Sequence, residues 1–104
     1  MAGVVEIRNY QLKAGRGAEF HALMQERCLP MLHDAGMEVL HAGPSADSDD
    51  IYVLIRGYAS VGDLQQSQDS FYGSAAWKQG PREAVLACIE NYISVVLDRK
   101  LIAG

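Results

Sequence analysis

The order of strand-like and helix-like segments constrains this chain more than any other feature of its sequence. Residues rich in β-branched and aromatic side chains, which are typical of strands, fill the segments 4–12, 37–43, 51–59 and 91–98. Apolar residues at three- and four-residue spacing, which indicate helices, occupy the segments 16–35, 61–71 and 81–89. With 61–71 and 81–89 counted as one interrupted helix, the order βαββαβ predicts an α+β fold with a four-stranded antiparallel sheet and both helices on one face. The other face of that sheet would then need a partner.

Proline, glycine and capping residues divide these segments. Pro30 removes a backbone donor inside the first helix, which predicts a kink or a break near residues 26–27. Gly36 is placed to end that helix in the left-handed conformation. Ser60 is predicted to cap the start of the second helix. The polar residues 44–50 are expected to form a mobile loop between the second and third strands.

Composition excludes several classes of protein. The 104 residues fit one domain, 1–104, and the hydrophobic fraction of 49% is enough for one core. A net charge of −4 with no basic run argues against a nucleic-acid partner. No apolar stretch approaches the length of a membrane span, and no leader pattern opens the chain, so we expect no membrane partner. Cys28 and Cys88 are predicted to be buried free thiols, which is consistent with a cytoplasmic location.

The sequence contains no pattern that indicates a metal or a cofactor. The three histidines, His21, His33 and His41, match no zinc-binding spacing, and solvated side chains are the better interpretation. There is no Cys-x-x-Cys, no phosphate-binding glycine loop and no Gly-x-Ser-x-Gly elbow. We therefore predict no metal site and no cofactor.

A polar and aromatic face is expected on the first and third strands, which βαββαβ connectivity makes neighbours. Alternation places one set of side chains on that face: Glu6, Arg8, Tyr10, Tyr52, Arg56 and Tyr58. One interpretation is a dimer interface with internal Glu–Arg pairing. The other is a ligand site, in which the arginines hold an anion and the tyrosines donate to a carbonyl or enolate oxygen. We favour the dimer interface of these two.

A second aromatic cluster contains Phe71, Tyr72 and Trp77, with Lys78 and Arg82 nearby. Aromatic residues around a helix break often line the mouth of a cleft, and they equally often close the open end of a core. The sequence does not decide between these two.

Taken together, these segments resemble the NIPSNAP family. The motifs that carry the resemblance are EIRNY at 6–10, KAG at 13–15, Phe20, LP at 29–30, AG at 35–36, IY at 51–52, RGY at 56–58 and FYGS at 71–74 with Trp77. The likeness runs from about residue 4 to residue 98, and the chain looks like a single-domain bacterial member. The family commonly has Pro–Gly where this chain has Ala14–Gly15, so the turn is expected to be looser here.

The resemblance implies the dimeric α+β barrel, in which two ferredoxin-like subunits pack sheet face to sheet face. Relatives with this fold include cofactor-independent monooxygenases, muconolactone isomerases and stress-response barrel proteins, so fold alone does not carry function. The resemblance supplies no agreed catalytic residues that could be placed on this chain.

Three hypotheses follow for function. The first is a homodimer that binds a small apolar or aromatic molecule through Tyr10, Tyr52, Arg56, Tyr58, Phe71 and Trp77. The second is a cofactor-independent monooxygenase or isomerase acting on an aromatic or polyketide-like substrate, with His21 as the base if it reaches the pocket. The third is a pure protein-interaction module, which predicts a filled core without a cavity. Whether the protein is an enzyme is left open.

Overall fold

Four strands form one antiparallel sheet in the computed structural model, which describes residues 3–103. They are β1 (Val4–Leu12), β2 (Glu38–Ser45), β3 (Ser48–Tyr58) and β4 (Ile89–Asp98). The strand order is β2-β3-β1-β4, so β1 lies between β3 and β4 and pairs antiparallel with both. The predicted ferredoxin-like βαββαβ fold is confirmed.

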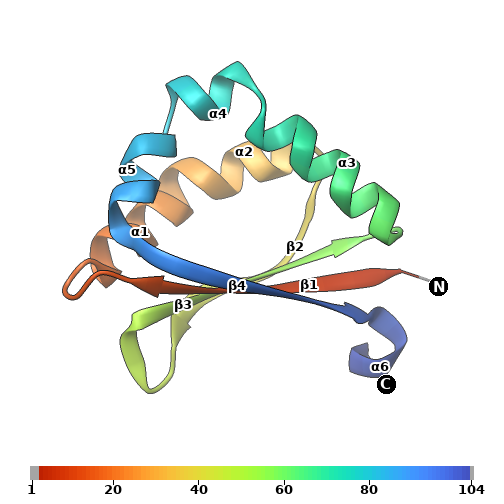
Figure 1. Ribbon diagram of the computed structural model, residues 1–104, viewed down its shortest axis with the longest axis horizontal. Helices are drawn as coiled ribbons and strands as arrows, with labels where there is room; N and C mark the ends of the chain where they lie inside the picture. The colour runs from red at the N-terminus through yellow and green to blue at the C-terminus, as the bar shows by residue number, and fades with distance from the viewer. Residues whose placement is uncertain (1–2, 104) are drawn as a thin grey trace.

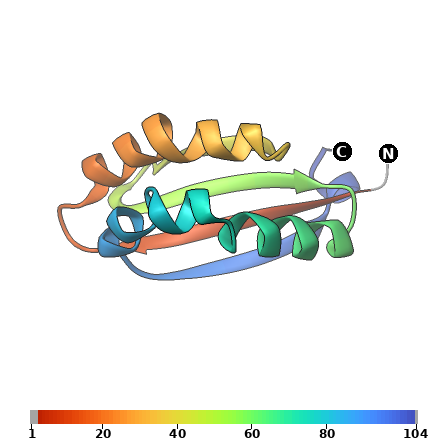
Figure 2. The same ribbon diagram turned by 90° about the horizontal axis from the view of Figure 1, so that it is seen from above.

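The helices form two arms on the same side of the sheet (Figures 1 and 2). The first arm contains α1 (Gly17–Leu23), the π-helix η1 (Met24–Cys28) and α2 (Leu29–Asp34). The second arm contains α3 (Val61–Tyr72), α4 (Ala75–Gln79) and α5 (Arg82–Cys88), and a short α6 (Arg99–Ala103) follows β4. Within the described residues, no helix has both the length and the apolar character needed to cross a membrane.

Pro30 explains the π-helix in the first arm. Its missing N–H and its ring are incompatible with a regular α-helical turn around the carbonyl of Glu26. The chain responds with a wider turn, in which the N–H of Leu29 bonds to the carbonyl of Met24, five residues back. The predicted irregularity near residues 26–27 is therefore confirmed, as a wide turn rather than a break. Gly36 then ends the arm with φ of 80°, as predicted.

The connection between β2 and β3 is shorter than predicted. Most of the polar segment 44–50 is strand, and only Ala46 and Asp47 form the turn. β2 is an edge strand of the sheet, so Pro44 is tolerated there because its missing donor would otherwise face solvent. Pairing continues to Ser45 and Ser48, which lie opposite each other across the turn.

The face of the sheet that the dimer-interface interpretation assigned to a second subunit is the face that the helices cover. Glu6, Arg8 and Arg56 lie on the face covered by the helical arms, and Arg56 is completely buried within a single chain. That polar face therefore cannot be a seam between subunits, and the prediction that it forms one is wrong. The opposite face, here called the outer face, is left uncovered by both arms, and Arg99 at the start of α6 lies over Gly57 at one end of it. It carries mainly aliphatic residues: Ile7, Val53, Ile55, Ile93, Val95 and Leu97.

Candidate ligand-binding pocket

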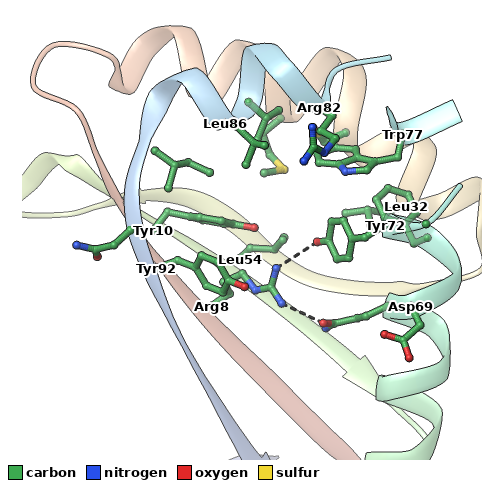
Figure 3. Close-up of a pocket in the computed structure, with 18 of the residues that line it drawn as sticks. Arg8, Tyr10, Leu32, Leu54, Asp69, Tyr72, Trp77, Arg82, Leu86 and Tyr92 are labelled. Carbon is green, nitrogen blue, oxygen red and sulfur yellow. Dashed lines mark hydrogen bonds between the residues drawn. The ribbon is translucent and has the colours of Figure 1, made fainter. Parts of the chain in front are cut away.

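A pocket of about 870 Å³ lies between the sheet and the two helical arms (Figure 3). Its size falls within the range usual for small-molecule sites. The apolar part of its wall comes from both arms and from the sheet: Met24, Cys28, Leu32, Leu54, Phe71, Trp77, Val85, Leu86 and Ile89. Arg8, Tyr10, Gln68, Tyr72 and Tyr92 meet at one end, here called the polar end. The other polar residues of the lining are exposed: Gln65, Asp69, Arg82, Glu90 and Asn91. The pocket thus has an apolar body and one polar end.

Glu6 organises the polar end from beneath the pocket. It lies on β1 directly opposite Arg56 on β3, and its Oε1 accepts hydrogen bonds from Arg56 Nη2 at 2.7 Å and Gln68 Nε2 at 2.9 Å. Its Oε2 accepts from Arg8 Nη2 at 2.8 Å and Ser94 Oγ at 2.6 Å. The Nε atoms of both arginines add a bond each, so the carboxylate has no acceptor capacity left for a ligand.

The charge state of Glu6 follows from these contacts. Burial raises the pKa of the Glu6 carboxyl, but Arg56, the hydrogen bond from Ser94 and Arg8 together outweigh burial and lower it overall. Glu6 is therefore ionised at neutral pH and neutralises one of the two guanidinium charges. The buried network of Glu6, Arg8 and Arg56 retains one net positive charge.

Arg8 is the member of this network that faces the pocket. Its guanidinium carbon lies 4.7 Å from the centroid of the Tyr92 ring, in a cation–π contact, and Nη2 donates to Gln68 Oε1 at 3.0 Å. Its Nη1 donates to the Tyr72 hydroxyl at 3.3 Å (Figure 3). Burial acts to lower the pKa of Arg8, but Tyr10, Tyr72 and Glu6 raise it, so the side chain stays charged.

Tyr72 and Gln68 reach the polar end from α3. That helix begins at Ser60, whose Oγ accepts a hydrogen bond from the backbone N–H of Asp63 at 3.0 Å, as the sequence predicted. Gln68 and Tyr72 are four residues apart and so lie on the same side of the helix. The Tyr72 hydroxyl accepts from Arg8 and, at 2.9 Å, from Arg56 Nη1. Both acceptor positions of its oxygen are then used, and its own proton is free to be donated.

Tyr10 adds a further hydroxyl to the polar end. Its side chain is 6% exposed, and its hydroxyl points into the pocket without a hydrogen bond to another described residue (Figure 3). Burial, with a smaller contribution from Tyr72, raises the pKa of Tyr10 against the smaller opposing effects of Arg8 and Arg56, so the phenol keeps its proton at neutral pH. Tyr10 is therefore available as a hydrogen-bond donor.

The pocket wall also contains a thiol, Cys28. Burial raises the pKa of Cys28 to about 11, against a smaller opposing effect of Arg27. A thiol that stays protonated at neutral pH is a weak nucleophile, so Cys28 acts as an apolar wall residue. Cys28 and Cys88 are both free and buried, as the sequence predicted.

The six predicted ligand-binding residues divide into two groups. Tyr10, Phe71 and Trp77 line the pocket. Tyr52, Arg56 and Tyr58 are buried outside the lining. Arg56 supports Glu6 and Tyr72 from below. The Tyr58 hydroxyl accepts from Gln68 Nε2 at 3.1 Å and donates to Met37 Sδ.

His21 is not placed to act on a ligand in this pocket. Its Nδ1 lies 2.8 Å from the Tyr52 hydroxyl, in a contact outside the pocket lining. The condition under which His21 would be a general base, that it reaches the pocket, is therefore not met in this structure.

Four residues at the polar end were not among the predicted ligand-binding residues: Arg8, Gln68, Tyr72 and Tyr92. Alternation places Arg8 on the face with Tyr10, where the arginines are expected to hold an anion, but the predicted ligand-binding residues do not include Arg8. Tyr72 belongs to the predicted aromatic cluster, and the four-residue spacing from Gln68 to Tyr72 could have indicated that Gln68 lies on the same side of the second helix. Tyr92 required the register of β4, in which it pairs with Tyr10, and no sequence pattern gives that register.

Comparison with solved structures places this arrangement in a known fold. A NIPSNAP family protein from Agrobacterium tumefaciens superimposes with a TM-score of 0.84 at 18% identity, over 92% of this chain and 84% of that one. A NIPSNAP-like domain protein from Burkholderia xenovorans gives a TM-score of 0.83 at 14% identity, over 91% of this chain and 83% of that one. This chain has the NIPSNAP fold.

The fold extends to more distant structures. A Nitrosomonas europaea protein, provisionally described as an antibiotic biosynthesis monooxygenase, gives a TM-score of 0.68 at 18% identity, covering 90% of this chain and 95% of that one. No protein-family model and no curated protein matches the sequence. The resemblance seen in the NIPSNAP-like motifs is thus supported by shared architecture.

Proposed function

We propose that this NIPSNAP-like protein binds a small apolar or aromatic molecule in the pocket between its sheet and its helices. The observation that carries the proposal is the pocket of about 870 Å³, whose apolar wall converges on one polar end. A pure protein-interaction module predicts a filled core, and a cavity of this size argues against that alternative. Phe71 and Trp77 would stack on the ligand from the second arm.

We further propose that the binding protein is a homodimer of the α+β barrel type, located in the cytoplasm. The support for dimerisation is the outer face, where Ile93 is 61% exposed and Val95 is 47% exposed on the side of the sheet that the two helical arms do not cover. Aliphatic side chains on an open sheet face gain free energy by packing against a second copy. The two buried free thiols are compatible with a reducing compartment.

Native mass spectrometry of gently purified protein tests both parts of this proposal. We expect a dimer that carries an additional small-molecule mass, which can then be identified. Because Trp77 is the only tryptophan in the chain, its fluorescence also reports specifically on occupation of the pocket. A monomer would contradict the dimer, and unchanged Trp77 emission across a broad panel of apolar and aromatic compounds would contradict the binding function.

A cofactor-independent monooxygenase or isomerase is the second candidate function. It is favoured by the group of Arg8, Tyr10 and Tyr72, whose donors could stabilise an enolate or phenolate oxygen. It is weakened by the position of His21 outside the pocket lining. Turnover of the molecule recovered from the purified protein, followed by mass spectrometry in the presence and absence of oxygen, separates catalysis from simple binding.

A further inference from the structure

We infer that the ligand of this pocket is an anion with an apolar body, whose anionic oxygen is received by Arg8, Tyr10 and Tyr72. This inference rests on the proposed binding function and specifies the chemistry of the ligand. It follows from the hydrogen-bonding capacity and the charge of the polar end.

The polar end offers donors to a ligand and almost no acceptors. The Tyr10 hydroxyl is unpaired among the described residues, and the Tyr72 hydroxyl has a proton left after accepting from two arginines. Arg8 Nη1 carries two N–H groups, of which one is directed to Tyr72. Glu6, the carboxylate paired with Arg8, is fully engaged by protein donors, and the carboxylate Asp69 in the pocket lining is exposed to solvent. A ligand group that accepts hydrogen bonds, such as a carboxylate, enolate or phenolate oxygen, therefore uses these donors best.

The net charge of the polar end favours an anionic ligand over a neutral hydrogen-bond acceptor such as a ketone or an ester. The network of Glu6, Arg8 and Arg56 contains two guanidinium groups and one carboxylate, all at most 8% exposed. Its remaining positive charge lies in a low-dielectric environment, where an anionic ligand neutralises it with little competition from water. Charge-assisted hydrogen bonds are also about twice as strong as neutral ones.

The rim of the pocket does not alter this preference. It carries Arg82 together with the carboxylates Asp69 and Glu90, which leave one net negative charge, and because all three side chains are exposed, solvent screens that charge far more than it screens the buried network. The apolar wall beyond the polar end accommodates the body of the ligand. The recognised class is thus an aromatic or aliphatic acid, or an acidic phenol or enol, with one anionic group.

Three probes with the same tricyclic body test the inference: anthracene-9-carboxylate, 9-anthracenemethanol and 9-anthracenemethylammonium. Energy transfer from Trp77 to the bound anthracene measures each dissociation constant at neutral pH. We expect the carboxylate to bind at least about tenfold more tightly than the alcohol, and the ammonium compound to bind most weakly. Arg8→Gln should abolish the preference for the carboxylate. The matched control Arg99→Gln removes an arginine outside the pocket and should retain it.

Tyr10→Phe provides a test that does not depend on the folding of Arg8→Gln, because it removes only an unpaired hydroxyl. It should weaken binding of the carboxylate and leave binding of the alcohol nearly unchanged. Equal binding of all three probes, or tightest binding of the ammonium compound, would overturn the inference and leave the binding function standing. A carboxylate preference that persists in both Arg8→Gln and Tyr10→Phe would also overturn it. Failure of all three probes to bind would count against the proposed function itself.

Discussion

Glu6 is the side chain on which the polar layer beneath the pocket depends. A carboxylate that is 1% exposed is costly unless its charge is paired and its oxygens accept hydrogen bonds. Both conditions are met here by two arginines, Ser94 and Gln68. Removing the charge of Glu6 would leave two buried guanidinium groups side by side without a counterion.

Glu6→Gln is therefore expected to destabilise the protein by about 3–5 kcal/mol at pH 7, the usual cost of breaking a buried ion pair. The pKa of Glu6 is lowered in the folded state, so its contribution to stability is fully present above the unfolded pKa of about 4.3. That contribution is lost as the pH falls through the lower folded pKa. The difference between wild type and Glu6→Gln should then narrow in urea denaturation below about pH 4.

Glu19→Gln is the control for this pH dependence. Glu19 pairs with Arg16 on the exposed surface of α1, so its removal should leave the free energy of unfolding nearly unchanged across the same pH range. A pH-independent difference between wild type and Glu6→Gln would mean that the carboxylate charge is not what stabilises the layer.

Alternation along β1 and β3 predicted correctly which side chains meet. Glu6 pairs with Arg56 and Tyr10 pairs with Tyr52 in the observed register, on one face as expected. Alternation shows which side chains share a face of the sheet. It cannot say which of the two faces the helices cover, because the aliphatic face could equally have packed against them. The decisive partner, Gln68, lies 62 residues from Glu6 in the chain, so no local pattern links them.

Trp77 serves both the core and the pocket wall, since it is 7% exposed and packs against Phe71 and Tyr72. Trp77→Ala is expected to cost about 3–5 kcal/mol of stability and to remove the additional small-molecule mass that we expect for the wild type in native mass spectrometry. The dimer should persist, because the outer face is on the other side of the sheet. Trp77→Phe should keep most of the stability and most of the ligand binding. Loss of the dimer in Trp77→Ala would contradict this prediction and would mean that Trp77 contributes to assembly.

The first helical arm shows how single residues shape an element. The wide turn at η1 adapts the helix to Pro30 while Met24, Cys28 and Leu32 stay buried. Sequence reasoning located this irregularity because proline has one physical effect in any context. It missed the extent of the β2–β3 hairpin, because the polar residues 44–50 gain their strand conformation from pairing rather than from intrinsic preference.

Gly36 ends the first arm in the left-handed region, with φ of 80°, and a Cβ there would meet no atom within 4 Å. Gly36→Ala is thus expected to cost about 1–2 kcal/mol through backbone strain alone, and Gly36→Asn less, because asparagine tolerates this conformation. Urea denaturation at neutral pH measures both. Gly62→Ala is the control of opposite sign: its Cβ would lie in ordinary contact with Ser60 Oγ at 3.7 Å inside α3, so it should be neutral or stabilising. Equal costs for Gly36→Ala and Gly36→Asn would exclude backbone strain as the cause.

In the molecule as a whole, the two faces of the one sheet differ in composition and in what covers them. The inner face combines aromatic side chains with a saturated ion network under the helical arms, and the outer face is aliphatic and uncovered. The usual inference, that the more apolar face of a sheet packs on the helices, gives the wrong assignment here. The outer face is apolar because, on our proposal, it becomes a second core when two copies associate.

Val95→Lys tests that proposal directly. Val95 is 47% exposed on the outer face, and a lysine there would bury a charge against the partner's aliphatic side chains, so the variant should be monomeric at micromolar concentration in analytical ultracentrifugation. Val61→Lys is the matched control, because Val61 is 62% exposed on α3, on the helical side of the molecule, and its replacement should leave the dimer intact. Pocket occupation, followed by Trp77 fluorescence, should survive in the monomer if each pocket is complete within one chain. A dimer that is equally stable in both variants would remove the outer face from the assembly and leave its aliphatic surface to a different partner.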